Sequence, residues 1–176
     1  MQECLLGQMS MEQIYRDFGL SPDDLRPILS VDVGDDIPDN VDQILKDRDV
    51  FVKNVLRYGK KDKVSSPVNF PRLVQKYTNN YSVKTDLTPR YVVDELNTLS
   101  SNSIIRHNKL FQILMRFHLS PKKVIVNMRL TRDLFDEMLK DVSFKYSKAM
   151  VHAGEMVGTL GAQSIGEPTT QLTLNT

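Results

Sequence analysis

TPRYVVDELNTLSSNSIIRHNKLFQILMRFHLSPKKVIVNMRLTRDLFDEMLKDV, residues 88–142, is the stretch that decides the fold class. Thr88-Pro89 and Ser120-Pro121 each place a capping side chain before a proline, and proline favours the first position of a helix. Apolar or aromatic side chains recur between and beyond these caps at intervals of three and four, as on one face of a helix. They are Val92, Val93, Leu96, Leu99, Ile104, Phe111, Leu114, Met115, His118, Leu134, Met138, Leu139 and Val142.

Two further signals in this stretch favour helices. Leu130 and Phe135 flank Thr131 at the spacing of a hydrophobic staple around a capping residue. KVIVNM, residues 123–128, is the most strand-like run in the chain, but it directly follows Ser120-Pro121 and is therefore predicted to be helical. The fold class predicted for the whole chain is mainly α.

The residues before this stretch continue the helical pattern. Ser10 with Gln13 forms a candidate capping box, and Ser21-Pro22 is another helix start. Residues 30–40 are acidic and are predicted to form a solvated loop. A helix is expected from Val41 to about residue 59, and a short one from Asn69. Their inward positions are Ile44, Leu45, Phe51, Val52, Val55 and Leu56 in the first and Leu73, Val74 and Tyr77 in the second.

Composition limits the function classes. The 176 residues are 40% hydrophobic and 26% charged, which suits a globular domain, or a small domain with an appendage. The net charge of +1 lacks the basic excess of a free-standing nucleic-acid binder. Cys4 is the single cysteine, so no disulfide framework or zinc site is expected, which is typical of a reducing intracellular compartment. No secretory signal or membrane span is expected, since a span needs roughly 18 apolar residues.

The C-terminal residues have a different composition. The last 27 residues contain no Lys, Arg or Asp and hold four of the eight glycines, at positions 154, 158, 161 and 166. Glycine within a helix costs about 0.5–1 kcal/mol relative to alanine, so this segment suits bending or close approach. The sequence therefore predicts a helical scaffold over residues 1–148 and a glycine-rich helix-hinge-helix segment over residues 149–176.

Simpler interpretations of this segment are weak. The G-x-x-x-G of Gly154 and Gly158 would suit a membrane helix pair, but its flanks are too polar. Ser164 resembles a hydrolase nucleophile without its usual first glycine, strand or base. The glycines do not form a phosphate-binding loop, because no Gly-Lys-Ser/Thr follows them.

Three side chains near the end of the chain share one predicted helix face. Pro168 can begin a helix, on which Gln171, Leu174 and Asn175 stand at i, i+3 and i+4. The two amides could bind a sugar hydroxyl while the leucine packs on a base. The alternative is that the amides are merely solvated and the leucine is a core residue.

Residues 151–176, VHAGEMVGTLGAQSIGEPTTQLTLNT, resemble the segment that leads into the trigger loop of the largest subunit of multisubunit DNA-directed RNA polymerases, homologous to bacterial β′. Three upstream segments are similar to the foot and cleft regions of the eukaryotic-type subunit, namely DRDVFVKNVL (47–56), SPVNFPRLVQ (66–75) and LTRDLFDEML (130–139). Gly161, Thr169-Thr170 and Leu172 look more like a large DNA virus or a divergent eukaryote than a bacterium. The nucleus, a viral factory or a virion is then the expected location.

The resemblance implies a role for each matching residue. Gln171 would bind the ribose of the incoming nucleotide, Leu174 would pack on its base, and Asn175 would lie near its sugar and phosphates. Gly166, Glu167 and Pro168 would form the bend that enters the trigger helix. The family places a histidine just after Asn-Thr, near the triphosphate. His107, His118 and His152 do not match that position.

The resemblance also implies partners and a metal. The family holds catalytic Mg²⁺ on three aspartates of an Asn-Ala-Asp-Phe-Asp-Gly-Asp run, which is absent from this sequence, where Asp23-Asp24 and Asp35-Asp36 lack that pattern. We therefore expect Mg²⁺ to be bound by residues outside this fragment, and the fragment to be inactive as a nucleotidyltransferase by itself. The implied partners are the second-largest and other polymerase subunits, template DNA, the RNA transcript and nucleoside triphosphates, with no membrane.

Two matters stay open at this point. The basic residues of the scaffold are Lys60, Lys61, Lys63, Arg106, Lys109, Arg116, Lys122 and Lys123. Lys122-Lys123 beside Arg116 is the best local patch, and it could touch nucleic acid or form a solvated or subunit-facing surface. The end at Thr176 suggests an intein, a split gene or a truncation. The alternative function is a non-catalytic helical interaction module that keeps a polymerase-like C-terminal segment.

Overall fold

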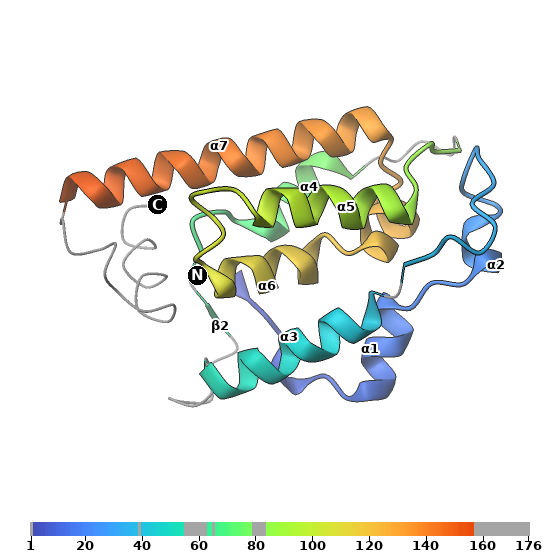
Figure 1. The fold of residues 1–176 in the computed structure, drawn as a ribbon, viewed down its shortest axis with the longest axis horizontal. Helices are drawn as coiled ribbons and strands as arrows, with labels where there is room; N and C mark the ends of the chain where they lie inside the picture. The colour runs from blue at the N-terminus through green and yellow to red at the C-terminus, as the bar shows by residue number, and fades with distance from the viewer. Residues whose placement is uncertain (1, 39, 55–62, 65, 79–83, 157–176) are drawn as a thin grey trace.

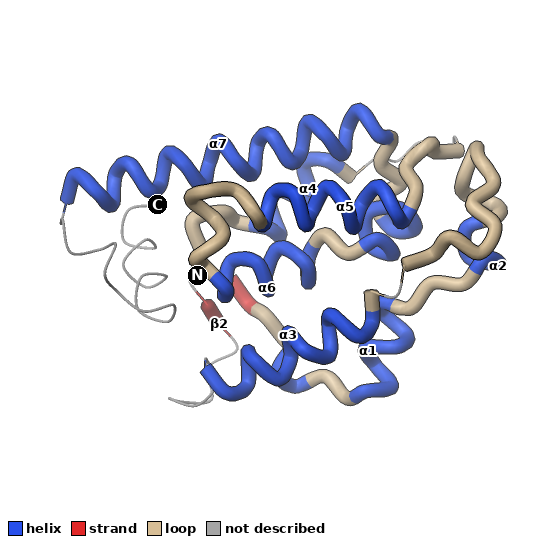
Figure 2. The backbone as a smooth tube through the Cα atoms, viewed as in Figure 1, coloured by secondary structure: helices blue, strands red, loops and turns tan. Residues whose placement is uncertain are grey.

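A computed structural model describes residues 2–38, 40–54, 63–64, 66–78 and 84–156, with side chains described for 4–38, 40–53, 66–78 and 84–150. The described chain is mainly helical, as predicted (Figure 2). Its α-helices are α1 (Met11–Phe18), α2 (Pro22–Leu25), α3 (Val41–Asn54), α4 (Phe70–Tyr77), α5 (Pro89–Ser100), α6 (Lys109–His118) and α7 (Arg132–Met156). The 3-10 helix η1 (Leu6–Gln8) and the π-helical turn η3 (Lys123–Asn127) complete the helical elements.

Helix α6 lies at the centre of the described fold (Figure 1). It contacts α3 on one side and α4 and α5 on the other, while α1 packs on α3 and α4 also contacts α7. Six consecutive residues of α6 are buried, from Leu110 to Met115. A helix that is buried on most of its circumference must be apolar on most of its circumference, and this one is.

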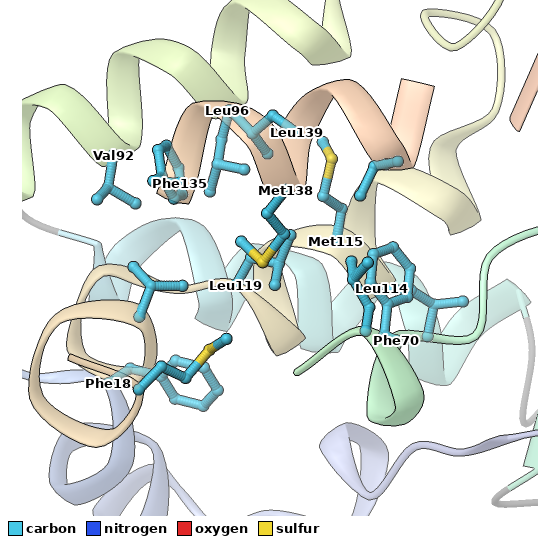
Figure 3. Packing of buried hydrophobic residues seen from close by; sticks show 14 of the residues in the cluster. Phe18, Phe70, Val92, Leu96, Leu114, Met115, Leu119, Phe135, Met138 and Leu139 are labelled. Atoms are coloured by element: carbon cyan, nitrogen blue, oxygen red, sulfur yellow. The ribbon is translucent and has the colours of Figure 1, made fainter. Parts of the chain in front are cut away.

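The described core is one continuous apolar cluster. Phe18 of α1, Phe70 of α4, Leu114 of α6 and Phe135 of α7 are each at most 1% exposed, and all belong to it. Figure 3 shows Leu114 of α6 beside Phe70 of α4, and Phe135 of α7 between Val92 and Leu96 of α5. Segments far apart in the sequence are therefore held together by shared apolar burial.

Most helix starts are where the sequence places them. Ser10 and Ser21 form complete capping boxes, with Gln13 and Asp24 respectively. The Thr88 hydroxyl accepts the Tyr91 N–H at 3.3 Å. The helical turn after Ser120-Pro121 is also confirmed, but the Ser120 hydroxyl is buried with no hydrogen-bond partner among the described residues. The Ser120 carbonyl, and not its hydroxyl, stabilises the turn by accepting a hydrogen bond from the Val124 N–H.

Two inward positions were predicted wrongly. Ile104 is 43% exposed, because it lies in the turn between α5 and α6 instead of in the first turn of α6. Val52 is 41% exposed, because Phe51 takes the core position of this turn of α3 and the next residue is rotated by about 100°. Val55 and Leu56 lie outside the described residues.

The described part of the acidic stretch, residues 30–38 and 40, is irregular as predicted. Gly34 has a φ of 55°, a conformation that glycine adopts without strain. The short strands β1 (Gln2–Glu3) and β2 (Lys63–Val64) pair antiparallel, and Leu29 forms an isolated parallel bridge with Thr85. No helix in the described ranges is long and apolar enough to cross a membrane.

Candidate functional site

The predicted nucleotide-contacting residues Gln171, Leu174 and Asn175, and the predicted bend at Gly166, Glu167 and Pro168, lie outside the described residues. The structure describes the helix that precedes them, α7. This helix continues to Met156, across the proposed division at residue 148, and its C-terminal turns extend past the ends of α4, α5 and α6 (Figure 1). The candidate site described here is therefore the attachment of α7 to the helical body.

The first turn of α7 is fixed by a cap and a staple. The Thr131 hydroxyl accepts the Leu134 N–H at 3.3 Å, and the Thr131 carbonyl accepts the Phe135 N–H at 2.9 Å. Leu130 and Phe135 on either side are both fully buried in the core, in agreement with the predicted staple. The Thr85 hydroxyl also donates to the Leu130 carbonyl, which ties this start to the segment before α5.

A second attachment joins α7 to α5. The Tyr91 hydroxyl donates to Asp136 at 2.6 Å, and the Arg132 guanidinium lies over the Tyr91 ring at 4.3 Å from its centre. The hydrogen bond to Asp136, together with burial, raises the pKa of Tyr91 to about 12. A cleft of about 490 Å³ lies between these helices, lined among others by Glu95, Asp136 and Lys140.

A third attachment joins α7 to α4. Asp141 accepts hydrogen bonds from Lys76 Nζ and from the Tyr77 hydroxyl, each at 3.2 Å, and pairs with Lys145 at 3.5 Å. Burial alone would raise the pKa of Asp141, but the bond from Lys76 and the two ammonium charges outweigh burial and lower it. The carboxylate is therefore held in its charged form between two helices.

A fourth attachment joins α7 to the start of α6. Tyr146 is 2% exposed, its ring lies 4.6 Å from that of Phe111, and its hydroxyl accepts a hydrogen bond from Asn108 at 3.1 Å. Neither Tyr146 nor Asn108 was predicted from the sequence, nor was the role of Asp141. An asparagine before an apolar helical run is a capping signal that could have identified Asn108, whereas its pairing with Tyr146 has no local signal.

The three basic residues singled out in the sequence, Arg116, Lys122 and Lys123, each contact another group of the chain. Arg116 forms a bidentate pair with Asp47, both contacts being 2.7 Å, with only 16% and 4% of the two side chains exposed. Lys123 points inward over the Phe117 ring, at 3.8 Å from its centre, and donates to the Phe117 carbonyl. Lys122 donates to the Arg16 carbonyl. Each of the three cations therefore has a partner within the chain, and for Arg116 and Lys122 that partner is distant in the sequence.

His118 is a packing residue. Its ring stacks on Phe70 at 5.3 Å and meets Phe117 edge-on at 5.1 Å, and its Nε2 is buried with no hydrogen-bond partner in the described part of the chain. Burial, with a smaller contribution from the charge of Lys123, lowers the pKa of His118 to about 3. The imidazole is therefore neutral at physiological pH and stabilises the core as an aromatic ring.

This histidine makes stability depend on pH. Between pH 6.5 and pH 3 the unfolded imidazole binds a proton that the folded one does not, so the free energy of unfolding should decrease as the pH falls. We expect a loss of about 1–2 kcal/mol between pH 6.5 and pH 5, measured by urea denaturation. His118→Phe should remove most of this slope, and an unchanged slope in that variant would assign the effect to other groups.

No metal site is formed by the described residues. They contain no group of three or more His, Cys, Asp or Glu side chains that could hold an ion. Asp23 pairs with Arg26, Asp24 caps α2, and Asp36 pairs with Arg90, so these aspartates are committed to separate local contacts. The residues present do not fit the Mg²⁺ that the resemblance implies.

These features define a helical scaffold that carries a long terminal helix. The family model described as RNA polymerase Rpb1, domain 6, matches residues 20–149. The chain belongs to this family and is a fragment of the largest subunit of a DNA-directed RNA polymerase. It therefore forms part of a nucleotidyltransferase and has other polymerase subunits as partners. The match covers α2 to most of α7, and residues 150–176 follow it.

Proposed function

We propose that residues 149–176 begin the trigger element of this polymerase and position the incoming nucleoside triphosphate. The observation that carries the proposal is the sequence VHAGEMVGTLGAQSIGEPTTQLTLNT, residues 151–176, which follows the residues matched by the family model, 20–149. In this proposal Gln171 binds the ribose, Leu174 packs on the base, and Asn175 lies near the sugar and phosphates. Gly166, Glu167 and Pro168 form the bend between two helices.

The attachment of α7 supports this proposal. A mobile element that closes over a substrate needs a fixed base, because closure must return the contacting side chains to the same place each time. Helix α7 has polar attachments to α5, to α4 and to the start of α6, and it buries one face between Phe135 and Ala149. Such a helix can serve as that base.

The remaining components are proposed to lie outside this chain. Mg²⁺ is bound by aspartates elsewhere in the polymerase, where it supplies charge stabilisation for phosphoryl transfer. The proposed partners are the second-largest subunit, template DNA and the RNA transcript, and the proposed location is the nucleus, or a viral factory or virion. The contribution of this chain is to orient the nucleotide.

Alanine substitutions of two side chains on the predicted face test the proposal. In the assembled polymerase, Gln171→Ala and Leu174→Ala should each slow addition of a matched nucleotide at least about tenfold, because they remove contacts made when the element closes. Single-turnover extension of a primed transcript measures this rate. Thr173→Ala is the matched control, since the helical period places residue 173 off that face. Normal rates in both test variants would contradict the proposal.

One observation favours the alternative of a non-catalytic interaction module. Arg116 and Lys123 face internal partners and Lys122 donates to the Arg16 carbonyl, so these three cations are engaged within the chain and are not all free to contact nucleic acid. Purification of the tagged chain distinguishes the two functions. A polymerase fragment should copurify with a second large subunit and with DNA-dependent nucleotide incorporation, whereas an interaction module should copurify with neither.

A further inference from the structure

Tyr146 is the last described side chain of α7 that forms an identified hydrogen bond to another element. The three attachments before it, at Asp136, Asp141 and the Thr131 cap, hold the first half of the helix. Ala149 and Met150 add apolar contact beyond Tyr146 but no polar restraint. Tyr146 is thus where the direction of the last turns of α7 is set by hydrogen-bond geometry as well as by packing.

Asn108, the hydrogen-bond partner of Tyr146, also caps helix α6. The Asn108 carboxamide oxygen accepts the Phe111 N–H at 3.0 Å and so caps α6, while its nitrogen donates to the Tyr146 hydroxyl at 3.1 Å. Phe111, in the first turn of α6, also packs against the Tyr146 ring at 4.6 Å. One carboxamide therefore fixes the start of the central helix and the distal half of α7 in the same geometry.

Small errors at this point become large at the end of the helix. Ten residues separate Tyr146 from Met156, which is about 15 Å at the helical rise of 1.5 Å per residue. A tilt of about 5° at Tyr146 therefore displaces the end of α7 by more than 1 Å. Misplacement of a reacting group by about 1 Å can slow an enzyme about 100-fold. A change in the orientation of α7 at Tyr146 would therefore be expected to slow a reaction whose contacts are carried by this helix.

We propose that Tyr146 and Asn108 are positioning residues for nucleotide addition, because their hydrogen bond and the Phe111 contact set the direction in which α7 delivers the segment after Met156. This inference rests on the proposed function of residues 149–176. It assigns these two residues no contact with the nucleotide. Their effect is transmitted through α7, so it should change the rate of the closed complex more than the apparent affinity for the nucleotide.

Two substitutions remove the same bond from opposite sides. Tyr146→Phe keeps the ring on Phe111 but removes the hydroxyl, and Asn108→Ser keeps a capping oxygen for α6 but is too short to reach Tyr146. Asn108→Asp is the conservative variant, because its carboxylate can cap α6 and accept a hydrogen bond from the Tyr146 hydroxyl. Tyr77→Phe is the matched control. It removes a tyrosine hydroxyl bond from α7 at Asp141, where Lys76 and Lys145 remain.

The measurement is matched-nucleotide addition by the assembled polymerase. Tyr146→Phe and Asn108→Ser should each lower the maximal rate about 3- to 10-fold with KM changed less than about twofold, and the double variant should be no slower than the slower single one. Asn108→Asp and Tyr77→Phe should stay within about twofold of wild type. Equal rates in all four single variants would overturn the inference, as would equal losses in Tyr146→Phe and Tyr77→Phe.

Gln171→Ala, assayed in parallel, distinguishes a failure of the positioning role from a failure of the proposed function. If it slows addition while Tyr146→Phe and Asn108→Ser do not, the proposed function stands and the positioning role is wrong. If Gln171→Ala has no effect, the proposed function fails and the positioning role fails with it.

Discussion

Asp47→Ala should lower the free energy of unfolding of this chain by about 3–5 kcal/mol, the usual cost of removing one partner of a buried ion pair. The substitution leaves the Arg116 guanidinium largely buried and without its two carboxylate contacts of 2.7 Å. It also removes the acceptor of the Gln43 amide, at 3.0 Å. Because Asp47 lies on α3 and Arg116 on α6, the loss should loosen the contact between these two helices.

Asp36→Ala is the matched control for this experiment. It also removes an aspartate that pairs with an arginine, Arg90, at 3.0 Å. In this pair, however, 49% of the Arg90 side chain and 59% of the Asp36 side chain are exposed. Exposed pairs contribute about 0–1 kcal/mol, so urea denaturation should separate the two variants by at least about 2 kcal/mol. Equal losses would show that burial does not determine the strength of the Asp47 pair.

Phe111→Ala should be similarly destabilising, by about 3–5 kcal/mol. The ring is 1% exposed and lies 5.5 Å from Phe70 of α4 and 4.6 Å from Tyr146 of α7. Its removal leaves a cavity where three helices meet, and ordered neighbours fill such a space only in part.

Phe144→Ala provides the comparison for the loss of an aromatic ring. Phe144 is on α7, two residues before Tyr146, and is 66% exposed. Its truncation should change the free energy of unfolding by less than about 0.5 kcal/mol. Chemical denaturation of both variants gives the difference, and similar losses would contradict the burial assigned to Phe111.

The helices could be predicted because their signals are local. The Ser10 and Ser21 capping boxes, the Thr88 cap and the staple around Thr131 each depend on residues within about five positions. The apolar spacing of residues 110–115 and 135–142 follows from the period of the helix itself. Both kinds of signal can be read from a single sequence. For this reason the predicted fold class and most predicted helix starts agree with the structure.

The partners of polar groups could not be predicted, because they are distant in the sequence. Arg116 and Asp47 are 69 positions apart, and Lys122 reaches a carbonyl 106 positions away. A lysine or arginine in a sequence shows its charge but not whether a carboxylate or carbonyl will meet it after folding. The internal partners of Arg116 and Lys122 could not be foreseen for this reason, and the bond between Tyr146 and Asn108, 38 positions apart, was missed for the same reason.

The candidate site divides in the same way. The nucleotide-contacting residues come from a contiguous motif, so the sequence supplies them directly, and they stay predictions. The attachments of α7 to the helical body are formed by Lys76, Tyr91, Asn108 and the α7 residues that they contact. These residues come together only in the folded chain.

The most direct test of the central claim is the selectivity for ribose of the assembled polymerase carrying Gln171→Ala. The measured quantity is the ratio of the addition rates of a matched ribonucleotide and its 2′-deoxy analogue. If Gln171 binds the ribose of the incoming nucleotide, the ratio should fall about tenfold, since a hydrogen bond of about 1.4 kcal/mol corresponds to a factor of ten. A ratio and a ribonucleotide rate both equal to those of the wild type would contradict the assignment of residues 149–176 to the nucleotide-binding element.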